Sequence, residues 1–406
     1  MNGQPNIEFS ILEFFEFSCL TQPFDLNRME AQIAAALAAA STASDYSQIA
    51  KWLKQWQANE PRNLLIRLYA AQLQERTNRL EAAEKNYLEL LKQTPSSKIM
   101  SQARAGIQRV QQQQAAIKAK ALSEAKQVVG GDEVSILAIA APPASQRQQT
   151  LEGIAKVFDL DAYTARLKVP ASGFRIHRIG PWGEISFFAQ ALKQVHVTTL
   201  AVQVSKVKAL PIFQICYFEA IAPQPIVICK NTAGQLGRLE FSWAEITQQV
   251  SGQLPIFEQV ADIGHWGRTV HQEKVQDYIQ VIDFHLKERQ IVLRLCDRLY
   301  QYQKGVSLTQ QSELNSRILW NHLQAHLQQS IKASHQNDFS RFSKGALEFI
   351  DILPPIHPYL DIDRRAPSHW DQAFHLYSGL CYFETSIQKK HKLEQTQNRK
   401  SNSLSS

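Results

Sequence analysis

The sequence predicts a multidomain α+β protein with an N-terminal α-helical array, a small βααβαβ unit and a C-terminal antiparallel β-rich domain with closing helices. Residues 30–127 are dominated by Ala, Leu, Gln, Glu and Lys, which favour helices. Residues 132–204 alternate short apolar runs with segments of helical periodicity. Residues 211–303 are rich in Ile, Val, Phe and Tyr, which favour strands. A length of 406 residues is sufficient for two or three such domains.

The expected domain boundaries follow the composition. Met29 precedes a clean helical pattern, so we expect it to be the natural start and the residues before it to be a non-native extension. Gly130 and Gly131 mark a flexible boundary. The expected segments are an extension over 1–28, a helical array and linker helix over 29–130, a small α/β domain over 131–205, a β-rich domain with C-terminal helices over 206–386, and a disordered basic tail over 387–406.

A 34-residue period runs through the helical array. The segment Asp45–Pro61 aligns on Arg79–Pro95, and both end in a proline. In the second segment a small residue, Ala83, is followed by Tyr87 on the same helical face. Over roughly residues 30–110 the chain resembles the tetratricopeptide repeat (TPR) family, whose repeats are 34-residue helix pairs. The alternative is an ordinary helical bundle in which this spacing has no meaning.

The TPR resemblance implies a protein-binding groove. In that family the first helix of each pair lines a concave surface that binds a partner protein. The groove positions of the second unit correspond to Gln72, Glu75 and Arg76 in this chain. These three residues are therefore the expected partner contacts, and the alternative is a plain solvated helix face.

The small α/β unit is predicted from alternating apolar patterns. Asp161 is an expected N-cap for a short helix that ends before Pro170. The other elements expected are strands at Val134–Ala140, Phe174–Ile179 and Thr198–Val204 and helices at Gln146–Phe158 and Ile185–Val195. This order is similar to that of the C-terminal domain of the bacterial ribosomal stalk protein, from which we carry over the fold but not the role.

The β-rich domain is expected to be an antiparallel sheet or small barrel of five or more strands, closed by helices from Gln310 onward. The expected strands are Ile212–Ile221, Ile226–Cys229, Leu236–Trp243, Tyr278–Phe284 and Ile291–Tyr300. The interval Leu254–Gln276 is expected to be loop-like or mixed.

The densest polar cluster of the chain is Asp361–His375, which predicts a candidate ligand site. Its arginines suit bidentate binding of a carboxylate or phosphate, and Asp371 and His375 lie four residues apart on one helical face. The candidate ligand-binding residues are Arg364, Arg365, His369, Asp371 and His375. The alternative is a structural ion-pair network that pins the last helix to the sheet.

Charge and motifs limit the function classes. The net charge is +7, but residues 131–386 are neutral and residues 387–406 alone carry +4. We therefore expect no specific nucleic-acid binding and only weak polyanion contact through the tail. The sequence has no phosphate-loop, dinucleotide-binding, serine-hydrolase or HExxH zinc motif, and its five cysteines are scattered, so we expect no cofactor and no metal.

These observations favour a non-enzymatic adaptor that recruits a protein partner through the helical array, in assembly of a larger complex. The array joined to the segment Trp370–Leu380 (WDQAFHLYSGL) also resembles uncharacterised TPR proteins of cyanobacteria, which implies a cytoplasmic or membrane-peripheral adaptor. No apolar run reaches the length of a membrane span. The alternatives are a translation- or RNA-associated factor and a ligand-sensing or enzymatic domain that uses the cluster Asp361–His375.

Overall fold

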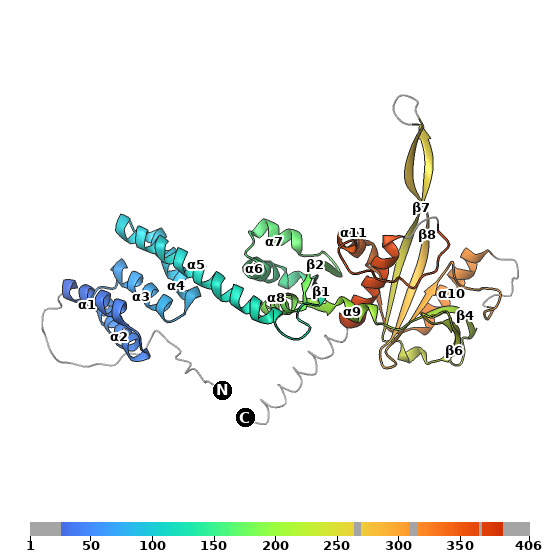
Figure 1. Ribbon diagram of the computed structural model, residues 1–406, viewed down its shortest axis with the longest axis horizontal. Helices are drawn as coiled ribbons and strands as arrows, with labels where there is room; N and C mark the ends of the chain where they lie inside the picture. The colour runs from blue at the N-terminus through green and yellow to red at the C-terminus, as the bar shows by residue number, and fades with distance from the viewer. Residues whose placement is uncertain (1–25, 264–268, 308–314, 365–367, 385–406) are drawn as a thin grey trace, which may run out of the picture. The chain divides into compact units, whose positions relative to one another are not determined.

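A computed structural model describes residues 26–263, 269–307, 315–364 and 368–384 (Figure 1). The protein is α+β, with a helical N-terminal region, then a mixed region of sheets and helices, and closing helices. This arrangement confirms the predicted fold class. The chain divides into two compact units between Lys120 and Ala121, a point inside helix α5. The predicted tail and residues 1–25 of the predicted extension lie outside the described residues.

The first unit is built from paired helices. Their bounds are α1 Leu26–Ala39, α2 Ala43–Asn59, α3 Leu64–Arg76, α4 Leu80–Gln93 and α5 Ser97–Lys126. Positions 34 residues apart are buried in both α2 and α4. These positions are Ile49, Leu53 and Trp56 in α2 and Ala83, Tyr87 and Leu90 in α4. The second helix of each pair therefore uses the same face to close its core, as a repeat requires.

Helix α5 approaches α4 closely at Gly106. A Cβ atom at this position would lie 2.4 Å from Cζ of Tyr87, so only glycine leaves room for the buried ring. The Tyr87 hydroxyl donates a hydrogen bond to Glu75 Oε2 at 2.8 Å. This bond joins α4 to α3, and the close approach at Gly106 joins α4 to α5.

The second unit begins with a three-stranded antiparallel sheet in the order β2-β1-β3. Its elements are β1 Val134–Ala140, η1 Ala144–Gln146, α6 Arg147–Phe158, α7 Ala162–Lys168, β2 Phe174–Pro181, α8 Trp182–Gln194 and β3 Thr199–Gln203. The predicted βααβαβ order is confirmed, and Asp161 caps α7 by accepting from the backbone of Tyr163 at 2.9 Å. The helices pack on Leu137 and Ile139, and the opposite sheet face belongs to another core.

A seven-stranded open sheet follows, in the order β10-β7-β8-β9-β4-β5-β6. Its strands are β4 Ile212–Ala220, β5 Ile226–Lys230, β6 Leu236–Glu240, β7 Gln248–Ile263, β8 Thr269–Leu286, β9 Ile291–Cys296 and β10 Ser334–Gln336. Most pairs are antiparallel, but β4 with β9 and β10 with β7 are parallel. Whether two strands pair in parallel or antiparallel depends on the long connections between them, such as the one from Cys296 to Ser334 that leads to β10. The pattern of apolar residues in the sequence does not reveal the direction of a strand.

The expectation of a loop-like or mixed segment over Leu254–Gln276 is wrong. Residues 254–263 belong to β7 and residues 269–276 to β8, and the two strands pair from Gln248 with His285 to Ile263 with Thr269. Residues 264–268 lie outside the described residues. The paired strands extend beyond the rest of the sheet as a two-stranded ribbon (Figure 1). Phe257 and Val275 in this ribbon are exposed, so this part of the ribbon does not need the apolar alternation of a strand with one buried face.

Helices cover both faces of the large sheet. Helix α10, Ser316–Ser330, packs Trp320, Leu323 and Leu327 on one face. On the other face, α11 (Phe339–Ile350) and a helix over residues 369–384 share one core with the inner face of the small sheet. The remaining elements are α9 Val204–Lys208 and η2 Trp243–Glu245. No helix in the described ranges is both long enough and apolar enough to cross a membrane.

Candidate functional site

The predicted partner contacts lie on α3. Gln72 is half-buried and Arg76 is exposed. Glu75 is held inside the unit: Arg109 donates to it through Nε at 2.7 Å and Nη2 at 3.0 Å, and Tyr87 donates its hydroxyl. Burial acts to raise the pKa of Glu75, but the bonds from Arg109 and Tyr87 outweigh it and lower that pKa. Glu75 is therefore engaged in ordering its neighbours.

Hydrogen bonds connect the first helix of each pair directly. The Tyr69 hydroxyl on α3 donates to Glu30 Oε1 on α1 at 3.3 Å. Glu75 on the same helix binds Arg109 of α5, which lies one 34-residue period further along the chain. Gln72 lies between Tyr69 and Glu75 in sequence, so it belongs to the α3 surface between these two contacts. The helices α1, α3 and α5 therefore form a connected polar face.

Among the described residues of the predicted cluster Asp361–His375, two candidate ligand residues come together and His369 does not join them. Arg364 pairs with Asp371, with 2.9 Å between Nη2 and Oδ1 and about nine-tenths of each side chain buried. His369 is exposed, 3.5 Å from Asp351 Oδ1. Arg365 lies outside the described residues. Burial raises the pKa of Asp371 to about 6, although the Arg364 charge acts in the opposite direction.

His375 belongs to a different group, a fully buried ion pair on the large sheet. Asp283 on β8 and Arg294 on β9 are directly opposite in the strand register. Both side chains are 0% exposed. Arg294 donates to the carboxylate through Nε at 2.8 Å and Nη2 at 2.7 Å, and through Nη1 to the backbone oxygen of Pro358. Burial would raise the pKa of Asp283, but Arg294 outweighs it and the pKa is lowered.

The partners of His375 fix its tautomer. Arg294 Nη2, which can only donate, lies 3.5 Å from Nδ1, so Nδ1 accepts. Nε2 then carries the proton and donates to the backbone oxygen of Val207 at 3.3 Å. Burial lowers the pKa of His375 to about 3, and the nearby Arg294 charge acts in the same direction. His375 is therefore a neutral ring that links the ion pair to α9.

A second buried histidine lies beside the pair. His285 is 0% exposed, with Nε2 3.0 Å from Ser378 Oγ and Nδ1 3.3 Å from Gln248 Oε1. Burial lowers its pKa to about 3. We name the five side chains of Asp283, His285, Arg294, His375 and Ser378 the buried polar network. It connects β8 and β9 to the helix over residues 369–384.

Four of these five residues lie outside the site predicted from the sequence, although a signal was present. Asp283 and His285 occupy alternate positions of the apolar run VIDFHL, and Arg294 is the lone charge in IVLRLC. A charge within a strand that must be buried needs a partner, and the two charged residues are complementary. None of the five residues lines the pocket described next.

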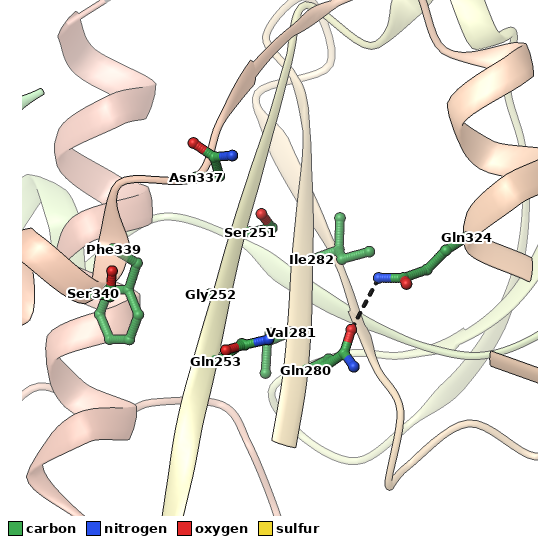
Figure 2. A pocket seen from close by; sticks show the side chains of 10 residues that line it. All are labelled: Ser251, Gly252, Gln253, Gln280, Val281, Ile282, Gln324, Asn337, Phe339 and Ser340. Atoms are coloured by element: carbon green, nitrogen blue, oxygen red, sulfur yellow. Dashed lines mark hydrogen bonds between the residues drawn. The ribbon is translucent and has the colours of Figure 1, made fainter. Parts of the chain in front are cut away.

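A pocket of about 260 Å³ opens beside β7 (Figure 2). Its ten lining residues contain no ionisable side chain. They are Ser251, Gly252, Gln253, Gln280, Val281, Ile282, Gln324, Asn337, Phe339 and Ser340. Gln253 and Gln280 are directly opposite in the register of β7 and β8. The pocket therefore offers hydrogen-bonding amides and hydroxyls. One of these hydroxyls, that of Ser251, is hydrogen-bonded to His335 Nε2 at 2.8 Å.

Within the described ranges, no three His, Cys, Asp or Glu side chains are grouped so that they would hold a metal ion. The resemblances to TPR proteins and to the ribosomal stalk protein remain predictions. No protein-family model, curated protein or solved structure matches this chain.

Proposed function

We propose that this chain is a non-enzymatic adaptor that recruits a protein partner through α1, α3 and α5, the first helices of a TPR-like array. The observation that carries the proposal is the connected polar face, in which Glu30 binds Tyr69 and Glu75 binds Arg109. Stacked helix pairs with such a face form extended binding surfaces in repeat proteins. The proposal includes a role in assembling a larger complex, either in the cytoplasm or at the periphery of a membrane.

The face is ordered before any partner arrives. Arg109 is 51% exposed, yet two hydrogen bonds to Glu75 hold its guanidinium in one orientation. Fixing a side chain in advance reduces the entropy lost on binding. Arg76, one residue beyond Glu75, is exposed on the same helix. Arg76 suits a partner that offers a carboxylate, since a guanidinium binds a carboxylate bidentately, whereas Arg109 already binds Glu75 in this way.

Recruitment is tested with two surface variants of the full chain. We expect Gln72→Ala combined with Arg76→Glu to weaken binding of the partner captured from the native cell by about 10-fold, because an interfacial arginine is lost and its charge reversed. The matched control is Lys51→Glu, which reverses an exposed charge on α2, away from the face. The measurement is the affinity of the purified partner for each variant. Equal weakening in both variants, or none in either, would contradict the proposal.

A further inference from the structure

The pocket beside β7 exists because strand β10 is short. β10 pairs with β7 only from Gln248 to Val250, so among the described strands none covers that edge from Ser251 onward. The chain then turns at Asn337 into α11, which begins at Phe339. On the other side, Gln324 reaches the same opening from α10. Five separate elements thus contribute side chains to one opening (Figure 2).

The orientation of the Gln280 amide is fixed by Trp320. The indole Nε1 can only donate, and it lies 2.9 Å from Gln280 Oε1, so that atom is the carbonyl oxygen. Gln324 Nε2 donates to the same oxygen at 3.1 Å, as the dashed line in Figure 2 shows. Trp320 is 1% exposed and packed in the core, so it does not release this bond readily.

This arrangement leaves one donor and one acceptor unused. The oxygen of Gln280 is occupied twice, and its Nε2 group has no protein partner among the described residues. Gln324 uses its amide nitrogen, so its Oε1 is left as an acceptor. Gln253 adds a third amide directly opposite Gln280, and Ser340 adds a hydroxyl. The Ser251 hydroxyl is already hydrogen-bonded to His335 Nε2 at 2.8 Å. A ligand that matches this set both donates and accepts hydrogen bonds, and we expect it to be uncharged because none of the ten lining side chains is ionisable.

We propose that this pocket binds a small neutral polyhydroxyl compound, a monosaccharide. Each sugar hydroxyl donates one hydrogen bond and accepts others, as the amides and hydroxyls of the pocket require. The volume of about 260 Å³ is just below the range of pockets that bind drug-sized ligands, which suits a single sugar ring. The pocket shares no residue with the face formed by α1, α3 and α5. A negative result for sugar binding would therefore leave the proposal of partner recruitment untouched, and the reverse also holds.

The test uses the full chain, with glucose, galactose, mannose and ribose as neutral probes and glucuronate and glucosamine as charged counterparts. The readout is the shift of the side-chain amide NMR resonances of Gln280 and Gln324, assigned by their loss in Gln280→Leu and Gln324→Leu. We expect at least one neutral sugar to shift both resonances and to bind more tightly than its charged counterparts. Each substitution is expected to weaken binding roughly 3- to 10-fold, because one hydrogen bond is lost.

The matched control is Gln329→Leu, which removes an exposed amide of the same helix that does not line the pocket. It should leave the affinity unchanged. A second variant, Gln324→Glu, keeps the side-chain length and places a carboxylate in the pocket, so it should shift preference from glucose toward glucosamine. The proposal is overturned if no neutral sugar shifts the resonances, if charged sugars bind equally well, or if Gln329→Leu weakens binding as much as Gln280→Leu.

Discussion

Replacing Arg294 by Met should destabilise the second unit by about 3–5 kcal/mol, since it leaves the Asp283 carboxylate buried without a counter-charge. Both side chains are fully buried, and the guanidinium makes two hydrogen bonds to the carboxylate. It also binds the backbone oxygen of Pro358, so the substitution removes a contact to the connector before the last helix. The measurement is the free energy of unfolding from urea titration of the full chain.

A double variant separates the cost of a lone charge from the cost of lost packing. Asp283→Leu combined with Arg294→Met removes both charges and keeps apolar volume between β8 and β9. We expect it to recover most of the stability that Arg294→Met loses, because hydrophobic replacement of a buried ion pair is often neutral or stabilising. If the double variant is as unstable as the sum of the two single variants, the pair contributes packing only and the interpretation is wrong.

Acidification from pH 6.5 to pH 5 should destabilise the second unit through its two buried histidines. The pKa values of His285 and His375 are lowered to about 3 in the folded chain, whereas the ordinary value is about 6.5. Between these values the unfolded chain binds a proton at each site and the folded chain does not, so stability falls as the pH falls. Each histidine should contribute a loss of about 2 kcal/mol over this interval.

Asp371 opposes this trend. Its pKa is raised to about 6 by burial, so below that value the folded chain takes up a proton that the unfolded chain takes up only near pH 4. The histidine effect is therefore measured as a difference between variants. Between pH 6.5 and 5 we expect stability to depend less steeply on pH in His285→Gln than in the wild type, by about 1.1 kcal/mol per pH unit on average. The exposed control His369→Gln should keep the wild-type slope, and an unchanged slope in His285→Gln would contradict the assignment.

The local elements were predictable because their patterns are local. In the small α/β unit the apolar face of each element and the Asp161 cap are all specified within a few residues. The 34-residue spacing likewise indicated the paired helices, and the equivalent positions in α2 and α4 are buried.

Contacts between residues that are far apart in the sequence could not be predicted from its local patterns. Within the cluster Asp361–His375, Arg364 and Asp371 pair with each other, but the fold places His375 beside Arg294, 81 residues earlier in the chain. The partners Asp283 and Arg294 are 11 residues apart and meet only because β8 and β9 form a hairpin with that register. The pocket depends on where β10 ends and on an indole 40 residues beyond Gln280, and neither is visible in the periodicity.

Recruitment through the first-helix face is tested most directly by site-specific photocrosslinking in the native cell. A photoreactive amino acid replaces the exposed Arg76 on α3 in the full chain, and the matched position is the exposed Lys51 on α2. We predict that position 76 crosslinks to one discrete protein and that position 51 does not. The account is contradicted if position 76 gives no crosslinked protein, or if both positions give the same products.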